Sequence, residues 1–411
     1  MCPNGVEFKT LGEVTYWDKR FNEVDRSLQP QIRKYHYYLA NELEELESPT
    51  GTIKILYTSN RIAYADEETV AENVVEAEVV AIPWGGNANI KYFKGKFITA
   101  DNRIAVVRDP SILSTKFVYY WLTKNQAEID SYYRGAGIKH PSMLKVLSLP
   151  IPLPPIEIQK KIVECLDKFS ALAAELQAEL QAELQLRRKQ YEYYRTQLLT
   201  PHSDCNSATK SDDRNWEWKT LGDVCTKIVS GGTPARNHAA YFNGTIPWMR
   251  TQEVDWKDVY DTEIHITEEA VKNSSAKLIP ANCVIIAMYG ATAGKSCINK
   301  IPVTTNQACC NLEIDTQKAL YKYVYYWVCK EYENIKGMGE GSQNNINGQK
   351  IKSYKIPLPS LAEQARIVSI LDKFEALTTS LSDGIPAEQA AQQKRYEYYR
   401  DLLLTFPRKA E

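Results

Sequence analysis

The sequence lacks several features that would place it in particular classes of protein. It has no run of about 18 apolar residues, which a membrane-spanning helix requires, and no charged-then-apolar N-terminus of the kind found in signal peptides. Its nine cysteines are an odd number and include no Cys-x-x-Cys pair, which argues against a disulfide framework or a zinc site. We therefore expect a cytoplasmic protein with reduced thiols.

Motifs of catalysis are also absent. Gly290-Ala-Thr-Ala-Gly-Lys-Ser296 resembles a phosphate-binding loop, but its glycines are separated by three residues and that motif needs four. Asp255-Trp-Lys257 could end a nuclease metal motif, yet no paired upstream carboxylate is evident. The five histidines lie far apart, and no Asn/Asp-Pro-Pro-aromatic segment typical of amino-methyltransferases occurs. We expect neither catalytic residues nor metal ligands in this chain.

The sequence does contain a long internal repeat. Residues 151–200 and 356–405 are each 50 residues long and align without a gap at an offset of 205, sharing Leu-Asp-Lys-Phe and Tyr-Glu-Tyr-Tyr-Arg. Shorter matches precede them, since Lys-Thr-Leu-Gly begins at Lys9 and at Lys219, and Val-Tyr-Tyr-Trp ends at Trp121 and at Trp327. The chain is therefore two halves of similar length, each a globular segment followed by a helical one.

The repeated segments predict long helices. Each opens with a proline-bounded run that cannot be helical, so a helix must begin after it. From Ile156 to Thr200 there is no glycine or proline, and apolar residues recur at helical spacing, which predicts one helix roughly 65 Å long. Its heptad-like seam needs a partner, for which the second copy is the obvious candidate. Gly384 and Pro386 should break that copy into two shorter helices.

The globular segments contain short β-rich runs separated by Gly and Asn turns, which predicts an α+β fold. In the first we expect helices near 31–47 and 114–132, with strands near 53–57, 79–82, 96–99 and 104–107. In the second we expect strands near 246–250, 283–288 and 309–314 and a helix near 318–335. The predicted domains are 1–150 and 216–355, with a spacer helix at 151–202, a linker at 203–215 and spacer helices at 356–405.

Charge is distributed unevenly along the chain, although the net charge is only −1. Residues 84–146 hold 10 Lys+Arg against 4 Asp+Glu, and residues 270–358 hold 11 against 5, an excess of six in each. Residues 1–83, by contrast, hold 8 against 15. Two basic patches, one per half, are therefore predicted, although lysines on solvated faces would give the same counts.

Taken in order around the helices, the loop motifs resemble the specificity (S) subunit of type I restriction-modification enzymes over nearly the whole chain. In the first half the motifs are Ile82-Pro-Trp-Gly-Gly-Asn-Ala-Asn89, Thr99-Ala-Asp-Asn-Arg103 and Arg134-Gly-Ala-Gly-Ile-Lys-His-Pro141. In the second they are Ile246-Pro-Trp-Met-Arg-Thr-Gln-Glu253, Tyr289-Gly-Ala-Thr-Ala-Gly-Lys295, Thr304-Thr-Asn-Gln307 and Ser342-Gln-Asn-Asn-Ile-Asn347.

This resemblance implies two target-recognition domains, held apart by antiparallel helices, that each read half of a split, asymmetric site on double-stranded DNA. It also implies two modification subunits that bring S-adenosylmethionine and methylate adenine. Restriction subunits would bring ATP and Mg²⁺, so that no cofactor binds this chain. Two alternatives stay open: a coiled-coil adaptor without DNA specificity, and a specificity subunit for an enzyme with fused methylation and cleavage.

Candidate DNA-binding residues follow from the loops, because Arg or Lys typically reads guanine and Asn or Gln reads adenine. In the first domain they are Trp84, Asn87, Asn89, Arg103, Arg134, Lys139 and His140. In the second they are Arg250, Gln252, Tyr289, Thr292, Lys295, Gln307, Gln343 and Asn345. Structural roles compete with this interpretation: Trp84 and Trp248 suit a core, Gly290 and Gly294 suit turns, and residues 304–307 suit internal hydrogen bonds.

The repeated helices carry candidate partner-binding residues. Identical motifs on a shared scaffold suit two copies of one partner, whereas sequence-specific DNA contacts should differ between the halves. We therefore assign to subunit binding or helix packing Tyr191, Tyr194, Arg195, Tyr396, Tyr399 and Arg400. Residues 174–185 repeat Ala-Glu-Leu-Gln three times, and each unit adds about 6 Å of helix, so this helix should set the spacing between half-sites.

Overall fold

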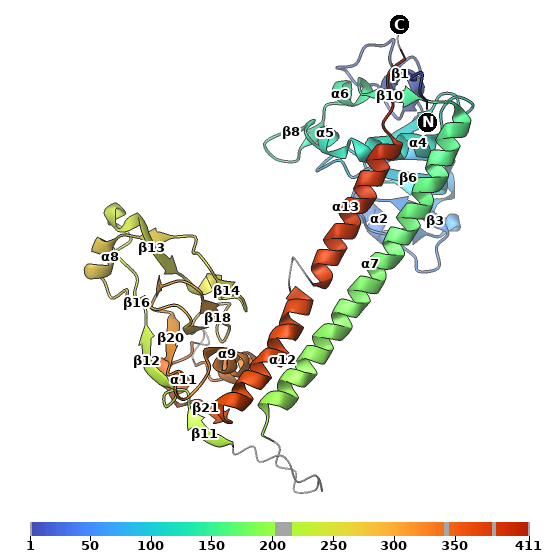
Figure 1. Ribbon diagram of the computed structural model, residues 1–411. Coiled ribbons are helices and arrows are strands. Elements are labelled where there is room, and N and C mark those ends of the chain that lie inside the picture. The colour runs from blue at the N-terminus through green and yellow to red at the C-terminus, as the bar shows by residue number, and fades with distance from the viewer. Residues whose placement is uncertain (1, 202–215, 341–344, 380–383, 410–411) are drawn as a thin grey trace, which may run out of the picture. The chain divides into compact units, whose positions relative to one another are not determined.

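The computed structural model describes residues 2–201, 216–340, 345–379 and 384–409 (Figure 1). The chain forms two compact units, Met1–Glu179 with Gln389–Glu411, and Leu180–Glu388. Each unit therefore combines one globular segment with parts of the repeated helices. The predicted linker, residues 203–215, lies outside the described residues, and the predicted domain boundaries stay a prediction. None of the described helices is long and apolar enough to span a bilayer.

A six-stranded sheet forms the centre of the first unit, in the order β2-β7-β5-β6-β3-β4. Neighbouring strands are antiparallel except β3 and β6, which are parallel. The strands span Thr15–Trp17 (β2), Ile53–Leu56 (β3), Ala63–Ala65 (β4), Val75–Pro83 (β5), Lys91–Thr99 (β6) and Asn102–Val107 (β7). The four strands predicted in this segment are confirmed as parts of β3, β5, β6 and β7.

Short helices and two small strand pairs complete the first unit. The helices are Leu11–Val14 (α1), Ala40–Glu45 (α2), Glu67–Val70 (α3), Ala71–Asn73 (η1), Thr115–Lys124 (α4), Gln126–Asp130 (α5) and Met143–Leu147 (α6). The strand pairs are Glu7–Thr10 (β1) with Pro150–Leu153 (β10), and Tyr133–Arg134 (β8) with His140–Pro141 (β9). The helix predicted over 114–132 is thus two helices, which meet at Asn125, where the side-chain amide donates to Trp121 O at 2.7 Å.

The helix predicted near residues 31–47 is wrong, since only Ala40–Glu45 is helical. Residues 32–38 instead run along the sheet, where Arg33 N donates to Trp17 O at 2.9 Å and Tyr38 N donates to Thr99 O at 3.0 Å. The phenol of Tyr37 reaches the buried carboxylate of Asp18. Contacts between these aromatic residues and the sheet therefore override the local helical pattern.

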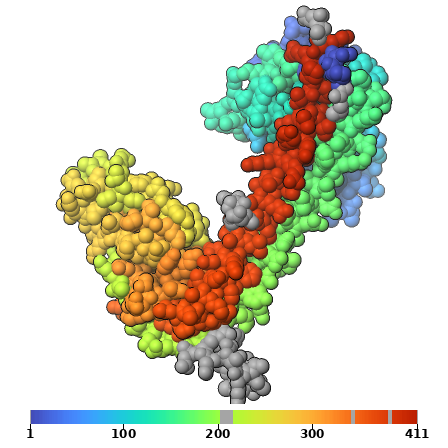
Figure 2. Space-filling model, viewed as in Figure 1, coloured from blue at the N-terminus to red at the C-terminus, as the bar shows by residue number. Residues whose placement is uncertain are grey.

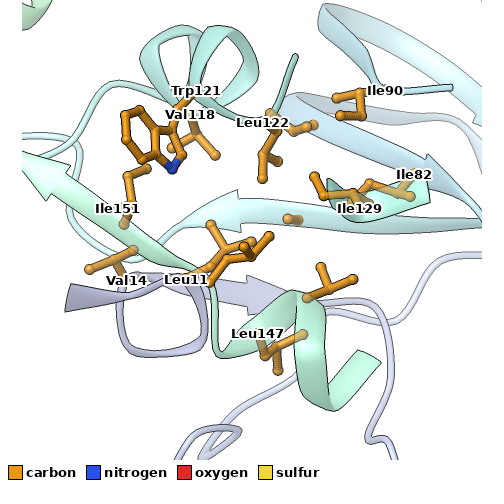
Figure 3. Packing of buried hydrophobic residues seen from close by; sticks show 14 of the residues in the cluster. Leu11, Val14, Ile82, Ile90, Val118, Trp121, Leu122, Ile129, Leu147 and Ile151 are labelled. Carbon is orange, nitrogen blue, oxygen red and sulfur yellow. The ribbon is translucent and has the colours of Figure 1, made fainter. Parts of the chain in front are cut away.

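The core of the first unit lies between the sheet, α4 and the β1–β10 pair. Figure 3 shows Val118, Trp121 and Leu122 of α4 turned toward Ile151 of β10 and Leu11 of α1, and all five side chains are buried. The indole of Trp121 also donates to Pro150 O at 3.2 Å. The proline-bounded run before the long helix is therefore a strand that ties the helix to the globular segment.

Two sheets form the second unit, in the orders β12-β20-β17-β18-β14 and β15-β13-β19-β16, beside the β11–β21 pair. The strands are Glu217–Thr220 (β11), Cys225–Ser230 (β12), Phe242–Met249 (β13), Asp258–Val259 (β14), His265–Ile266 (β15), Leu278–Ile279 (β16), Val284–Ala287 (β17), Ser296–Asn299 (β18), Val303–Thr305 (β19), Cys309–Ile314 (β20) and Lys355–Leu358 (β21). The helices are Ala239–Tyr241 (η2), Thr251–Glu253 (η3), Glu268–Lys272 (α8), Tyr321–Lys330 (α9), Tyr332–Lys336 (α10) and Gly348–Ser353 (α11). The three predicted strands are confirmed, and the predicted helix is again divided into two, α9 and α10.

The repeated segments form the helices expected of them. The first copy is one helix, Ile156–Leu199 (α7), and the second is two, Leu361–Thr379 (α12) and Ile385–Leu403 (α13). In the first unit α7 and α13 lie side by side and antiparallel (Figures 1 and 2), with the Ser170 and Tyr396 hydroxyls 3.0 Å apart. In the second unit α12 lies beside α7, and Tyr194 stacks on Phe374 with ring centroids 5.4 Å apart.

Contacts between helix and globular segment are repeated in the two units. Lys116 and Tyr120 of α4 donate to Asp167 of α7 at 2.7 and 2.6 Å. The equivalent residues of α9, Lys322 and Tyr326, donate to Asp372 of α12 at 2.7 and 2.5 Å. Gln159 and Gln364 likewise accept from the backbone before α4 and α9, each at 2.9 Å. The contacts between each globular segment and its helix are therefore repeated in the two units.

Candidate nucleic-acid interface

Hydrogen bonds join two loops of the first unit, the loop after β5 and the β8–β9 hairpin. Gly86 N donates to Lys139 O at 2.9 Å, and His140 Nδ1 lies 2.7 Å from Trp84 O. Trp84 N in turn donates to Asp101 O at 2.9 Å, which fixes the start of the first loop. The structure thus brings together five residues predicted from sequence, namely Trp84, Asn87, Arg134, Lys139 and His140.

The ring of Trp84 lies among an aromatic and two cationic side chains. It stacks on His140 with centroids 5.0 Å apart and an interplanar angle of 28°. Lys19 Nζ lies 4.7 Å from its centroid and the Arg103 guanidinium 4.9 Å. A cavity of about 500 Å³ adjoins it, lined among others by Lys19, Arg20, Arg134 and His140. Cationic side chains around an open cavity suit the phosphates of a nucleic acid.

Arg103 does not lie on this surface, and its predicted place on the DNA face is wrong. Its side chain is fully buried and forms ion pairs with Asp18, at 2.9 Å, and with Asp101. Strand residues alternate between two faces, but β7 is buried on both faces over residues 102–106, so Arg103 lies in the interior. Burial raises the pKa of Asp18, although the Arg103 charge opposes that rise. Arg103 is therefore a buried contact of the Trp84 ring and does not reach solvent.

Asn89 is also used within the protein. Its side-chain nitrogen donates to Thr58 O at 3.1 Å, and Lys91 Nζ donates to the same carbonyl at 2.9 Å. Burial lowers the pKa of Lys91 to about 8. The exposed candidates of this unit are consequently Asn87, Arg134, Lys139 and His140.

In the second unit, the ends of two parallel strands bring the candidate loops together. Met249 of β13 pairs with Thr305 of β19, so Arg250 and Asn306 leave the sheet at the same end. Asn306 N donates to Met249 O at 2.9 Å. Thr292 Oγ1 donates to Thr251 O at 2.8 Å, which joins the 289–295 loop to the turn that carries Gln252.

Several candidates in this unit already have partners inside the protein. Arg250 forms an ion pair with Glu263, Lys295 forms one with Asp255 at 2.6 Å, and Gln307 accepts from the Thr233 hydroxyl. Gln252 and Tyr289 are exposed, whereas Asn345 has a buried side-chain oxygen without a partner among the described residues. Gln343 lies outside the described residues. Arg250, Lys295 and Gln307 would have to exchange a protein partner for DNA.

The competing structural interpretations hold at several positions. Trp248 is buried and its indole donates to Gly232 O at 3.0 Å, so it belongs to the core. Gly290 and Gly294 adopt φ of 83° and 85°, which L-residues rarely adopt, so both serve a turn. That turn leads into β18 and not into a helix, unlike a phosphate-binding loop. Thr304 Oγ1 donates to Pro247 O at 2.8 Å, an internal hydrogen bond.

The two Tyr-Glu-Tyr-Tyr-Arg segments place their tyrosines alike. Tyr194 stacks on Phe374, and its counterpart Tyr399 contacts Phe169 with ring centroids 5.9 Å apart. Tyr396 bonds Ser170, and its counterpart Tyr191 packs against the core of its own unit. The arginines also have local contacts, Arg195 with the Tyr191 ring and Arg400 with Asp401. Helix packing thus uses part of each motif, and the partner-binding role stays a prediction.

Some residues of these surfaces were missed in the sequence. Tyr193 and Tyr398, at equivalent positions of the repeat, are 60% and 64% exposed. Their identity in both copies was the signal that could have found them. Lys19 and Arg20 line the cavity beside Trp84, and only their adjacency in the sequence hinted at it. Within the described ranges, no cluster of three or more His, Cys, Asp or Glu could hold a metal ion.

Two α+β units on a duplicated helical scaffold, with basic and amide side chains on unlike loops, define a nucleic-acid recognition protein. A family model described as "Type I restriction modification DNA specificity domain" matches residues 3–186 and 213–389. The chain is 35% identical over 420 residues to the EcoR124I/EcoR124II specificity subunit of Escherichia coli, with 97% of this chain and 98% of that protein covered. It is 33% identical over 374 residues to the putative specificity subunit S.HindORF215P of Haemophilus influenzae, with 85% and 90% covered.

Solved structures agree on the fold. A chain from a structure describing assembly and conformational transition of the type I R-M system has a TM-score of 0.63 at 16% identity, with 98% of both chains covered. The HsdS subunit from Thermoanaerobacter tengcongensis has a TM-score of 0.53 at 17% identity, with 98% and 96% covered. The chain belongs to the type I restriction-modification specificity family and is a DNA-recognition subunit of such a system. The adaptor and fused-enzyme alternatives are not favoured.

Proposed function

We propose that each globular segment reads one half of a split, asymmetric site on double-stranded DNA. The observation that carries this proposal is the contrast between scaffold and loops. The ion pair of Lys116 with Asp167 recurs as that of Lys322 with Asp372 at the same distance of 2.7 Å. The loops differ, since the first unit offers a Trp-His stack and the second an Arg-Glu pair. A constant scaffold with unlike loops suits two different half-sites.

The bases would be read by the exposed polar residues of these loops. In the first unit the exposed Asn87 and His140 would read bases, and Lys19, Arg20, Arg134 and Lys139 add charge that attracts phosphates. In the second, Gln252 and Tyr289 are exposed and Thr292 holds their loops together. Arg250, Lys295 and Gln307 would contribute after leaving their protein partners.

Two modification subunits would dock on the helices, one at each Tyr-Glu-Tyr-Tyr-Arg segment. They would bring S-adenosylmethionine and flip the target adenine, and restriction subunits would bring ATP and Mg²⁺. This division of labour leaves the chain as a non-catalytic subunit. It also explains its near-neutral net charge, because partners can supply most of the phosphate attraction.

Sequencing of methylated adenines tests this function. Cells with the intact system should show one bipartite motif that disappears when this gene is deleted. Asn87→Ala should weaken recognition of one half of the motif only, and Gln252→Ala that of the other half. A methylation pattern that survives deletion of the gene, or a motif without two separated halves, would contradict the proposal.

A further inference from the structure

His140 differs from the other exposed candidates of the first unit because its ring is held in place. Exposed side chains usually rotate between rotamers, which costs entropy when they bind. Here the imidazole stacks on Trp84, with centroids 5.0 Å apart, and Nδ1 lies 2.7 Å from Trp84 O. A stack and a hydrogen bond together fix both the position and the rotation of the ring. Such preorganisation is what specific recognition requires.

The hydrogen bond also fixes which ring nitrogen carries the proton. A carbonyl oxygen can only accept, so Nδ1 must donate to Trp84 O. In the neutral ring Nε2 then has a free lone pair and is a hydrogen-bond acceptor. No described residue donates to Nε2, and His140 lines the open cavity of about 500 Å³. The protein therefore presents one acceptor of defined orientation to whatever enters that cavity.

The Trp84 ring, on which His140 stacks, is itself held in place. Lys19 and Arg103 lie against the Trp84 ring, and Arg103 is anchored by the buried Asp18 at 2.9 Å. The backbone of the hairpin is tied down as well, because Gly86 N donates to Lys139 O. A Cβ on Gly85 would lie 2.8 Å from Ile138 Cγ2, so a glycine there lets the loop and the hairpin approach. Trp84 would consequently act as a positioning residue, since its ring already stacks on the His140 imidazole.

We propose that Nε2 of His140 determines specificity by accepting a hydrogen bond from the exocyclic amino group of adenine or cytosine in the first half-site. In the major groove only adenine N6 and cytosine N4 offer a donor, whereas guanine and thymine present acceptors there. This inference rests on the proposed function, and it assigns to one residue a choice between two classes of base. The cationic neighbours Arg20 and Arg134 would hold the phosphates and carry no base preference.

The first experiment uses the complete complex with its modification subunits and DNA whose first half-site is randomised while the second is kept. The wild-type complex should prefer adenine or cytosine about tenfold at one position. His140→Phe keeps an aromatic ring on Trp84 but removes the acceptor, and should lose that preference alone. Lys139→Met, its neighbour, is the matched control and should weaken binding to all sequences alike. An unchanged preference in His140→Phe, or an equal loss for all sequences, would refute the assignment.

The second experiment changes the DNA, so that its main measurement, made on the wild-type protein, does not depend on folding of a variant. The preferred base is replaced by its analogue without the exocyclic amine, purine for adenine or 2-pyrimidinone for cytosine. Binding should weaken about tenfold for the wild type and hardly at all for His140→Phe. Full affinity of the wild type for the analogue would overturn the inference alone. A wild-type complex with no preference anywhere in the first half-site would instead overturn the proposed function.

Discussion

At the scale of single residues, the buried ion pair of Arg103 and Asp18 connects the folding stability of the first unit with the loops around Trp84. Both side chains are fully inaccessible, and the Arg103 Nε has no partner among the described residues. Such a pair is expensive to bury and is therefore a poor source of stability. The Arg103 guanidinium lies 4.9 Å from the centroid of the Trp84 ring. The role of the pair is therefore to keep the loop after β5 in one conformation.

Removal of one partner should have a large effect. Arg103→Met leaves the Asp18 carboxylate buried without its counter-charge and should lower the free energy of unfolding by about 3–5 kcal/mol. Urea denaturation followed by fluorescence would measure the loss. Lys94→Met is the control, since the ion pair of Lys94 with Glu78 lies at the surface and should contribute only about 0–1 kcal/mol. Equal effects of the two substitutions would contradict the role given to the buried pair.

A second residue, Glu375, makes the two copies of the scaffold unequal. Burial raises the pKa of this carboxyl, although Tyr326 donates to it at 2.7 Å. Its counterpart in the first unit is Ser170, which carries no charge. With a folded-state pKa above the unfolded one, the native state binds more protons, so its stability falls as pH rises from the unfolded pKa of about 4.3 through the folded value.

Glu375→Gln should therefore raise the melting temperature of the second unit at pH 7 and flatten its decrease with pH. The amide keeps an acceptor for Tyr326 and removes the buried charge. Calorimetry between about pH 4 and pH 8 would measure both effects. Ser170→Ala, the matched change in the first unit, should leave the slope unaltered. A slope that Glu375→Gln does not change would mean that this carboxyl does not titrate in that window.

At the scale of elements, local sequence patterns predicted the long helices and several strands. The helix α7 follows from 45 residues without glycine or proline, and the break between α12 and α13 follows from Gly384 and Pro386. The strands around Ile53 and Cys309 followed from β-rich runs. In each case the pattern that allowed the prediction lies within a few residues along the chain, although the strands are completed by distant partners.

Where the deciding contacts are distant in sequence, the prediction failed. Residues 31–39 have a helical pattern, but Tyr37 and Tyr38 bind to Asp18 and to the strand at Thr99. Arg103 belongs to a loop motif, yet the pairing of β7 with β5 turns it into the core. The loops were found as candidates, whereas the roles of Lys19 and Arg20 depended on a fold that brings them to Trp84.

The exposed tyrosines of the repeated helices lead to a prediction about partners. Tyr193→Ala should weaken the binding of one modification subunit about tenfold, because exposed tyrosines are frequent anchors of interfaces. Tyr398→Ala should weaken the other copy equally, since the two positions are equivalent. Analytical ultracentrifugation should then detect complexes with one modification subunit in place of two.

Tyr191→Ala serves as the contrasting control, because Tyr191 packs against the core of the second unit. It should lower thermal stability, which Tyr193→Ala should leave unchanged. Full occupancy by two modification subunits in the Tyr193→Ala, Tyr398→Ala double variant would exclude these tyrosines from the docking surface.

At the scale of the whole molecule, we predict that the length of the helix α7 contributes to specificity besides the loops. The boundary between the two compact units falls between Glu179 and Leu180, inside the threefold Ala-Glu-Leu-Gln repeat of residues 174–185. The helix α7 continues through this boundary from Ile156 to Leu199. The number of four-residue units therefore sets how much helix separates the two globular segments along the chain.

Deletion of residues 178–181 tests this arrangement, because it removes one unit, about 6 Å of helix, and leaves every loop intact. The unread spacer between the half-sites should shorten by one or two base pairs, at about 3.4 Å each, while both half-sites stay unchanged. Mapping of methylated adenines would measure the spacer directly. Glu179→Gln, which keeps the helix length, is the control and should methylate the original spacing. A deletion variant that methylates the original spacing as well as the wild type does would show that the distance is set elsewhere.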